Sequence, residues 1–80
     1  MARWVLYIIE CRDSSLYTGI TTDIQKRLQS HNEGKASKYT RIRRPVKIVY
    51  TEDFATESSA RRREAKVKSF SREEKLKLVA

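Results

Sequence analysis

The sequence has few cysteines, histidines and glycines, and each shortage argues against a class of site. Its one cysteine, Cys11, cannot form an internal disulfide. A small domain without disulfides is typical of the reducing cytoplasm, where we expect the protein. One histidine and no Cys-x-x-Cys pair argue against a structural zinc site. The two glycines, Gly19 and Gly34, are too few for a P-loop or a dinucleotide-binding fingerprint.

Long hydrophobic runs are also missing. The N-terminal apolar run, Trp4–Ile9, is much shorter than the about 20 residues that cross a bilayer, and it is too short for a signal-peptide core. We therefore expect neither a membrane span nor an export signal. The 80 residues are enough for one domain, residues 1–80, with one small core. A core of this size leaves no room for a buried small-molecule cofactor.

Negative charge is scarce, because 18 Lys and Arg residues stand against 10 Asp and Glu residues and give a formal net charge of +8. A small body with this charge attracts polyanions, namely nucleic acid, an anionic membrane or an acidic protein. No predicted helix combines a broad apolar face with a basic face, which argues against a membrane surface. We expect nucleic acid as the partner, and the charge alone does not identify a protein partner.

The hydrophobic pattern predicts three strands and three helices in the order ββαβαα. The strands are expected at residues 4–11, 16–20 and 46–54, and the helices at residues 22–31, 56–69 and from 71 onward. The capping residues expected at the helix starts are Thr22 with Gln25, Thr56, and Ser71 with Glu74. These elements predict an α+β domain, in which a small three-stranded sheet, mixed or antiparallel, is flanked by helices. In the third strand, alternation places Val46, Ile48 and Tyr50 on one face.

Polar side chains able to take part in chemistry are spread over the predicted strands and helices. They are Tyr7, Tyr17, Arg27, His31 and Glu64. Arg27 and His31 are four residues apart and share one face of a helix. Glu64 interrupts the apolar positions Ala60 and Val67, so we expect it to face inward. An inward carboxylate is costly unless it is paired or binds a metal.

Each of these residues also has an ordinary structural explanation. The two tyrosines are typical strand aromatics, and Glu64 can pair with Arg61 or Lys68 along its helix. Cys11 and His31 are residue types of a nucleophile pair, but a cysteine in a strand is better interpreted as a buried thiol. The site hypothesis therefore depends on the combination of residues and not on any one of them.

The connector between the first helix and the third strand is strongly basic. Clustered cations on a domain of this charge predict a track for phosphate groups, and an aromatic side chain among them is a candidate stacking partner for a base. The residues concerned are Lys35, Lys38, Tyr39, Arg41, Arg43 and Arg44. The ordinary alternative is a solvated surface. The connector also has room for one helical turn.

The segment LYTGITTDIQKRLQSHNEGKASKYTR, followed by a helical Glu64, resembles the small stand-alone bacterial branch of the GIY-YIG nuclease superfamily. The resemblance covers residues 4–78. Tyr17-Thr-Gly19 stands at the second half of the name-giving motif, where Gly19 is the structural glycine. Val5-Leu6-Tyr7 stands at the first half and keeps only the tyrosine. The asparagine that often follows the catalytic glutamate in the family has no counterpart here.

This resemblance implies hydrolysis of phosphodiester bonds with one divalent ion, Mg²⁺ or Mn²⁺. Arg27 would stabilise the negative charge of the phosphorane, and Glu64 would hold the metal largely through water. Tyr7 or Tyr17 would position or deprotonate the attacking water, and His31 would orient a tyrosine or contact phosphate. Which tyrosine acts as the base stays open.

A shared site requires both tyrosines on one face of the sheet. A two-residue turn in the hairpin would put them on opposite faces, because a slip of one residue flips every side chain. We predict a three-residue loop, residues 13–15, which brings them to one face. The expected register pairs Cys11 with Tyr17 and Ile9 with Gly19.

Two hypotheses for the function follow. The first is a metal-dependent endonuclease or exonuclease that acts on DNA in repair or processing. We expect the shape of the DNA and not its sequence to direct it, because the chain leaves no room for a second, specificity domain. The second is a nucleic-acid-binding module that does not cut, or an adaptor of a repair complex, which the altered first half-motif and the missing asparagine suggest. The sequence does not separate DNA from RNA.

Overall fold

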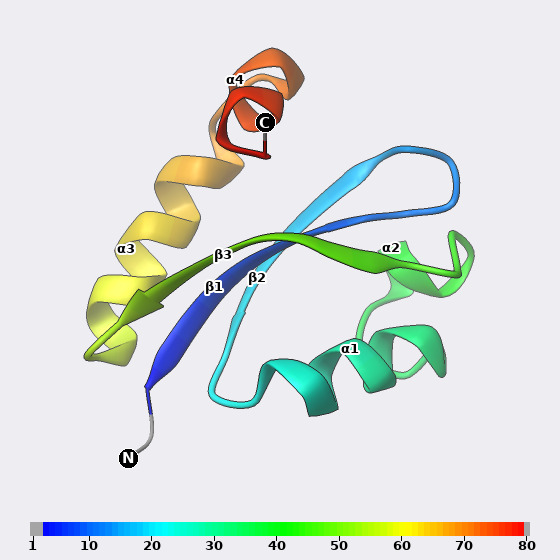
Figure 1. The fold of residues 1–80 in the computed structure, drawn as a ribbon, viewed down its shortest axis with the longest axis horizontal. Coiled ribbons are helices and arrows are strands. Elements are labelled where there is room, and N and C mark those ends of the chain that lie inside the picture. Colours follow the sequence, from blue (N-terminus) through cyan, green and yellow to red (C-terminus); the bar gives the residue numbers. More distant parts are fainter. Residues whose placement is uncertain (1–2, 80) are drawn as a thin grey trace.

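The computed structural model describes residues 3–79 and has the predicted order of elements. The three strands form one sheet in the order β2-β1-β3, with antiparallel pairing throughout (Figure 1). The elements are β1 (Trp4–Glu10), β2 (Leu16–Thr21), α1 (Ile24–Asn32), α2 (Lys38–Arg41), β3 (Lys47–Phe54), α3 (Glu57–Lys68) and α4 (Arg72–Val79). The predicted α+β fold is confirmed, and α2 is the helical turn expected in the basic connector.

The sheet separates two small hydrophobic cores. On one face, Tyr7 and Ile9 of β1 pack against α1. On the other face, Leu6 and Ile8 pack against Val67 of α3, and α4 packs beside it. Figure 1 shows α1 and α2 together on one side and α3 and α4 together on the other. Because successive side chains of a strand point to opposite faces, the central strand serves both cores.

The β1–β2 hairpin has the predicted facing but not the predicted register. Tyr7 lies opposite Gly19 and Ile9 lies opposite Tyr17, which is a shift of two residues from the expected pairing. The loop has the predicted three residues but lies one position earlier, at residues 12–14, because the backbone amide of Cys11 donates a hydrogen bond of 2.9 Å to the Ser15 carbonyl and closes the turn there. A shift of two residues leaves every side chain on its face. The two tyrosines therefore share one face, as a common site requires.

A β-bulge in β3 breaks the alternation expected from the sequence. Ile9 of β1 pairs with Ile48, but the preceding residue of β1 pairs with Tyr50, which leaves Val49 as an extra residue. Ile48 and Val46 pack on the α1 side of the sheet, whereas Val49 and Tyr50 pack on the α3 side. The expectation that Tyr50 shares a face with Val46 is therefore wrong, because a bulge inserts one residue and reverses the alternation beyond it.

The helix starts agree with the predicted caps in two of three cases. Thr56 caps α3, and Ser71 forms the expected capping box with Glu74 at the start of α4. The cap of α1 is Asp23 and not Thr22, because the Asp23 carboxylate accepts a hydrogen bond of 3.1 Å from the Lys26 amide. A carboxylate in this position also interacts favourably with the helix dipole, which a threonine hydroxyl does not.

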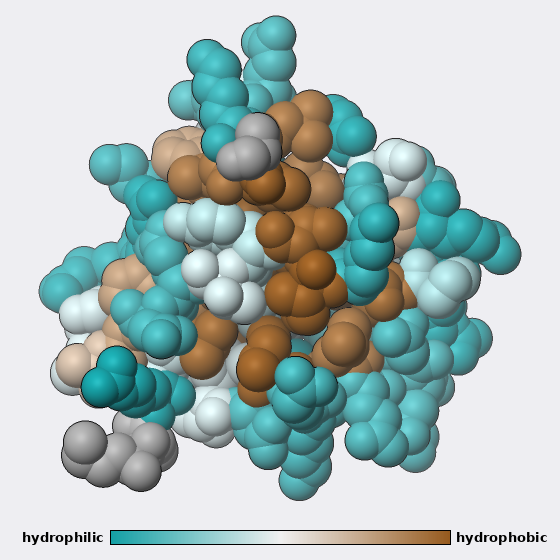
Figure 2. All heavy atoms as spheres, viewed as in Figure 1, coloured by the Kyte–Doolittle hydropathy of each residue, from teal (hydrophilic) through white to brown (hydrophobic). Residues whose placement is uncertain are grey.

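The surface is polar over most of its area. In the view of Figure 2, hydrophobic side chains gather over the middle of the molecule below α4, and hydrophilic side chains surround them. The most exposed large hydrophobic side chain among residues 3–79 is Ile42, at 69%. No helix in this part of the chain is long and apolar enough to cross a membrane.

Candidate active site

Tyr7 and His31 form a buried pair at the centre of the predicted site. The Tyr7 hydroxyl lies 2.9 Å from Nε2 of His31, and Nδ1 of His31 lies 2.8 Å from Oγ1 of Thr40. Thr40 in turn donates its hydroxyl to the Ser37 carbonyl at 3.3 Å. The exposed fractions are 2% for Tyr7, 1% for His31 and 0% for Thr40. Strand β1 and helices α1 and α2 thus contribute one continuous chain of hydrogen bonds.

The direction of each hydrogen bond follows from the end of this chain. Because Thr40 gives its one hydroxyl proton to Ser37, its oxygen accepts from Nδ1–H of His31. A neutral imidazole with its proton on Nδ1 has a lone pair on Nε2, so Tyr7 donates to Nε2. Burial, and then the nearby charge of Arg27, lowers the pKa of His31 and keeps the ring neutral. The tyrosine proton therefore points at a base.

Gly19 makes room for the Tyr7 ring. A Cβ atom at position 19 would lie 2.5 Å from the Tyr7 hydroxyl oxygen and 2.7 Å from Cζ. These separations are far below van der Waals contact. The missing side chain on β2 therefore lets Tyr7 lean across the neighbouring strand and reach His31 on α1.

Substituting Gly19→Ala is expected to lower the free energy of unfolding by about 1–3 kcal/mol, the usual cost of overpacking a filled core. The Tyr7 ring is buried and hydrogen-bonded to His31, so it cannot give way without losing one of these contacts. Equilibrium unfolding in urea measures the change. A variant as stable as the wild type would show that the ring is free to move and would contradict this account of Gly19.

Thr40→Val is expected to cost about 1–3 kcal/mol of stability, because it leaves the buried Nδ1–H of His31 without an acceptor. The chain offers a matched control in Thr18, which is 3% exposed and whose hydroxyl has no hydrogen-bond partner among residues 3–79. Thr18→Val should leave stability unchanged or raise it. Urea unfolding of the two variants compares them, and equal losses would mean that the Thr40 hydroxyl does not hold His31.

The stability of the protein should fall as the pH drops below about 6.5, the ordinary pKa of histidine. His31 is the one histidine, and its pKa is lowered in the folded state by burial and by Arg27. The unfolded chain therefore binds a proton at a higher pH than the folded chain, so stability is full above about pH 6.5 and is lost on acidification. Urea unfolding between about pH 7.5 and 5.5 measures this, and a His31→Gln variant with the same slope would contradict it.

Tyr17, Arg27 and Glu64 each act on the Tyr7–His31 pair. Burial raises the pKa of Tyr7 most, the charges of Tyr17 and Glu64 raise it further, and Arg27 lowers it. The Tyr17 ring meets the His31 ring edge to face, with 5.4 Å between centroids. Arg27 is exposed on α1, and Tyr17 is half-buried on β2. Contacts therefore join Tyr7, Tyr17 and His31, and the charges of Arg27 on α1 and Glu64 on α3 act on Tyr7.

Glu64 is a partly buried carboxylate on α3. Its Oε2 lies 3.2 Å from Nζ of Lys68, and its side chain is 20% exposed. The preceding residue, Arg63, pairs with Glu52 of β3 at 3.0 Å, which fixes the orientation of α3 against the sheet. Lys68 was one of the two partners expected for Glu64. The other, Arg61, pairs with the carboxylate one turn earlier on α3.

The oxygen donors at this site suit a hard, hydrated cation. Among residues 3–79, no three His, Cys, Asp or Glu side chains gather into a metal site. Glu64 is the carboxylate whose charge acts on Tyr7. A single carboxylate fits Mg²⁺, which keeps several waters and takes one or two protein carboxylates, better than Zn²⁺, which takes three or four protein ligands.

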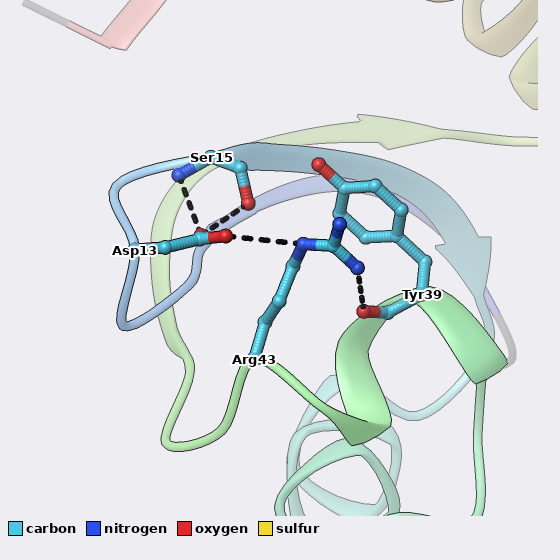
Figure 3. Close-up of polar contacts among 4 residues, drawn as sticks. All are labelled: Asp13, Ser15, Tyr39 and Arg43. Atoms are coloured by element: carbon cyan, nitrogen blue, oxygen red, sulfur yellow. Dashed lines mark hydrogen bonds and ion pairs between the residues drawn. The ribbon is translucent and has the colours of Figure 1, made fainter.

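The basic connector is partly engaged in the fold, which Figure 3 shows for Arg43. Arg43 Nε lies 3.1 Å from the Asp13 carboxylate, and Nη1 donates to the Tyr39 carbonyl at 2.8 Å. Its guanidinium lies 4.0 Å from the centre of the Tyr39 ring. That ring stacks on Tyr17, with 5.9 Å between centroids. Tyr39, predicted to stack on a base, and Arg43, predicted to bind phosphate, therefore connect the hairpin turn to Tyr17.

The other cations of the connector differ in whether their side chains already have a partner in the fold. Lys38 and Arg41 are exposed, and their side chains have no hydrogen bond or ion pair within residues 3–79. Lys35 Nζ lies 3.8 Å from the Glu33 carboxylate in an exposed pair. Arg44 donates to the backbone carbonyls of Arg41 and Asn32. The predicted phosphate track thus has fewer cations available for phosphate than the sequence suggests.

The sequence did not indicate the role of Thr40 or the pairing of Asp13 with Arg43. Thr40 reaches His31 from the next helix, and a threonine in a basic connector carries no pattern of its own. The Asp13–Arg43 pair joins residues 30 positions apart. The nucleophile pair of Cys11 and His31 does not form, because both ring nitrogens of His31 bind Tyr7 and Thr40, whereas Cys11 is a buried free thiol.

Comparison with known proteins gives a consistent result. Residues 3–77 match the family model described as the GIY-YIG catalytic domain. A UPF0213 protein of Staphylococcus haemolyticus is 52% identical over 79 residues, which cover 99% of this chain and 96% of that protein. A UPF0213 protein of Staphylococcus saprophyticus is 52% identical over 80 residues, covering 100% and 98%.

Two solved structures share the fold. The solution NMR structure of a UPF0213 protein of Bacillus halodurans has a TM-score of 0.63 at 45% identity and covers 96% of this chain and 82% of that one. That of a protein from E. faecalis has a TM-score of 0.66 at 42% identity and covers 94% and 80%. With the family match over nearly the whole sequence, the chain belongs to the GIY-YIG family, a nuclease-type family whose members bind nucleic acid.

Proposed function

We propose that this protein is a cytoplasmic, divalent-metal-dependent nuclease that hydrolyses phosphodiester bonds in DNA during repair or processing. The observation that carries the proposal is the Tyr7–His31 hydrogen bond of 2.9 Å, with the opposite charges of Arg27 and Glu64 acting on it. A phenol aimed at a neutral imidazole is a proton-accepting unit. A guanidinium and a carboxylate beside it are the groups that phosphodiester hydrolysis needs.

The proton of the attacking water passes through this unit. Burial raises the pKa of Tyr7, so a free phenolate is disfavoured and Tyr7 alone is a poor base. When Tyr7 takes a proton from water, its own proton moves to Nε2 of His31, and no unpaired phenolate forms. The imidazolium keeps its Nδ1–H on Thr40, which holds the ring in place.

Arg27 and Glu64 act on the charge of the reacting phosphate. Arg27 is exposed on α1, and its planar guanidinium can bind two phosphate oxygens as negative charge builds up on them. Glu64 would hold the metal with the help of water. A bound Mg²⁺ or Mn²⁺ supplies stabilisation of the leaving oxygen. Lys68, whose side chain is half-exposed, must release Glu64 for this.

The expected substrate is DNA with a distinctive shape, such as a flap, a branch or an end. The net charge of +8 and the exposed cations Lys35, Lys38 and Arg41 favour contacts with phosphate, which carry no sequence information.

A panel of flapped, branched and linear DNAs, each labelled at one end, tests the proposal. The wild type should cut at least one of them with Mg²⁺ or Mn²⁺ and none of them with a chelator. Arg27→Ala and Glu64→Ala should lose the activity. Equal cleavage by all three proteins would show that another site or a contaminant is responsible.

Two observations favour a second function: Tyr7 is buried, and Glu64 is paired with Lys68. Both limit the access of a substrate or a metal ion to the site. In that case the protein is a nucleic-acid-binding module or an adaptor of a repair complex. Salt-dependent binding that survives Glu64→Ala, with no cleavage on any member of the panel, would select it over the nuclease.

A further inference from the structure

A shallow groove lies where the C-terminal ends of α1 and α2 meet the hairpin turn. Its volume is about 770 Å³, and it is lined by Arg12, Asn32, Arg41, Ile42, Arg44 and Pro45. We call these six residues the arginine groove. Three of them are arginines and none is acidic, so the groove concentrates positive charge beyond that of the connector alone. Arg12 comes from the hairpin turn and was not part of the predicted phosphate track.

Arg44 is fixed in this groove by backbone atoms. Its Nε donates to the Arg41 carbonyl at 2.8 Å, and its Nη1 donates to the Asn32 carbonyl at 3.4 Å. The guanidinium lies against Gly34, where a Cβ atom would be 3.0 Å from Nη1. Gly34 has a φ of 79°, which also favours glycine. A cation is thus held in one position, and no carboxylate of residues 3–79 pairs with it.

Arg12 and Arg41 complete a cationic surface in the groove. Their side chains make no hydrogen bond or ion pair with any residue from 3 to 79. The Arg41 side chain also touches the Gly34 position, 3.2 Å from where a Cβ would be, so it packs next to Arg44. Like charges held together repel one another, and an anion between them relieves the repulsion. One guanidinium group can bind two phosphate oxygens at the same time.

The apolar part of the groove narrows the choice of anion. Ile42 is 69% exposed between the arginines, and Pro45 is exposed beside it. An exposed apolar side chain surrounded by guanidinium groups matches a ligand that alternates phosphates with sugars. The sugar–phosphate backbone of a nucleic acid has this character, since its phosphates are charged and its deoxyribose rings offer apolar surface.

The groove lies on the same two helices as the candidate active site. Asn32 directly follows His31 on α1, and Arg41 directly follows Thr40 on α2. From Arg27 to Asn32 is five residues, or about 7.5 Å along the helix axis. Successive phosphates of one DNA strand are about 3.4 Å apart along the duplex axis. The rise from Arg27 to Asn32 thus corresponds to about two phosphates of one DNA strand, so the groove would hold a different phosphate from the one that Arg27 binds.

We propose that the arginine groove binds the sugar–phosphate backbone of the substrate a few nucleotides to one side of the cleaved bond. This inference rests on the proposed function, because it takes DNA as the ligand and Arg27 as the position of the reacting phosphate. It makes the groove a second anchor, so that the nuclease prefers DNA with an extended arm on that side. Arg12, Arg41 and Arg44 bind phosphates, and Ile42 packs against a sugar.

Binding of fluorescently labelled branched DNA, followed by anisotropy without divalent ions over a range of salt concentrations, tests the groove. Arg12→Gln with Arg41→Gln removes two charges and should weaken binding by tenfold or more. The slope of log Kd against log salt should fall by about 1.8, since each lost phosphate contact contributes about 0.9. Ile42→Ala should weaken binding but leave this slope unchanged, because it removes no charge.

The matched control is Arg72→Gln with Lys77→Gln on α4, which removes the same charge from exposed positions on the other side of the sheet. It should weaken binding less than threefold. Equal weakening by both double variants, or none by the groove variant, would overturn the inference. All variants should unfold at the wild-type temperature.

Failure of this inference and failure of the nuclease proposal give different results. Binding is measured without catalysis, so a groove that binds DNA in a protein that never cuts it would support the groove as a site for the DNA backbone and refute the nuclease. A wild type that cuts the panel, together with a groove variant that binds all DNAs normally, would do the reverse.

Discussion

Tyr7→Phe, His31→Gln and the double substitution should each lower the rate of DNA cleavage by about the same factor, about 10²- to 10⁴-fold. The two side chains act as one unit through their 2.9 Å hydrogen bond. Without the hydroxyl, His31 cannot reach the water, and without the imidazole, burial keeps the pKa of Tyr7 too high for it to act as a base. When two groups work as a unit, removing either of them abolishes the contribution of both to the rate. Single-turnover rates at saturating enzyme concentration measure the three variants.

Two results would contradict this pairing. If the double variant loses the product of the two single factors, the residues act independently. Tyr17→Phe is the matched control, because it removes a hydroxyl from the same face of the sheet and should retain most of the rate. A larger loss for Tyr17→Phe than for Tyr7→Phe would assign the proton transfer to Tyr17. Urea unfolding of each variant separates a loss of rate from a loss of folded protein.

Arg27→Ala should lower the cleavage rate by about 10²- to 10³-fold, the usual effect of removing a group that stabilises charge in the transition state. Arg27 is exposed, so the substitution should change stability by less than about 0.5 kcal/mol. Arg27→Lys should recover only part of the rate, because an ammonium group cannot bind two phosphate oxygens in a fixed plane. Single-turnover cleavage and urea unfolding measure the two effects.

The neighbouring cation provides the control for Arg27. Lys26 is exposed on the same turn of α1 and carries the same charge. Lys26→Ala should weaken DNA binding slightly and change the cleavage rate less than threefold. If Lys26→Ala and Arg27→Ala lowered the rate equally, the effect would come from the overall charge of α1 and not from a placed guanidinium.

The fold was largely predictable because its signals are local. The strand that is apolar on both faces and the capping residues Thr56 and Ser71 mark elements without reference to the rest of the chain. The details that failed depend on contacts between elements. The two-residue shift in the hairpin follows from a turn closed over residues 11–15, and the bulge at Val49 follows from the fit of β3 against β1.

The candidate site was predictable as a set of residues but not as an arrangement. The spacing of Arg27 and His31 and the resemblance to a nuclease family gave the five side chains. They left open which tyrosine His31 would orient, and the geometry shows it bonded to Tyr7. Thr40 bonds to His31, and Asp13 forms an ion pair with Arg43. Both contacts join separate elements, so no local sequence pattern predicts them.

The most direct test of the whole account is the single-turnover cleavage of the best substrate from the DNA panel, with Mg²⁺, by the wild type and by Glu64→Gln. Glu73→Gln, which makes the same change at an exposed position of α4, is the control. We predict cleavage by the wild type and by Glu73→Gln that stops when the ion is chelated, and none above background by Glu64→Gln. Undiminished cleavage by Glu64→Gln would contradict the account.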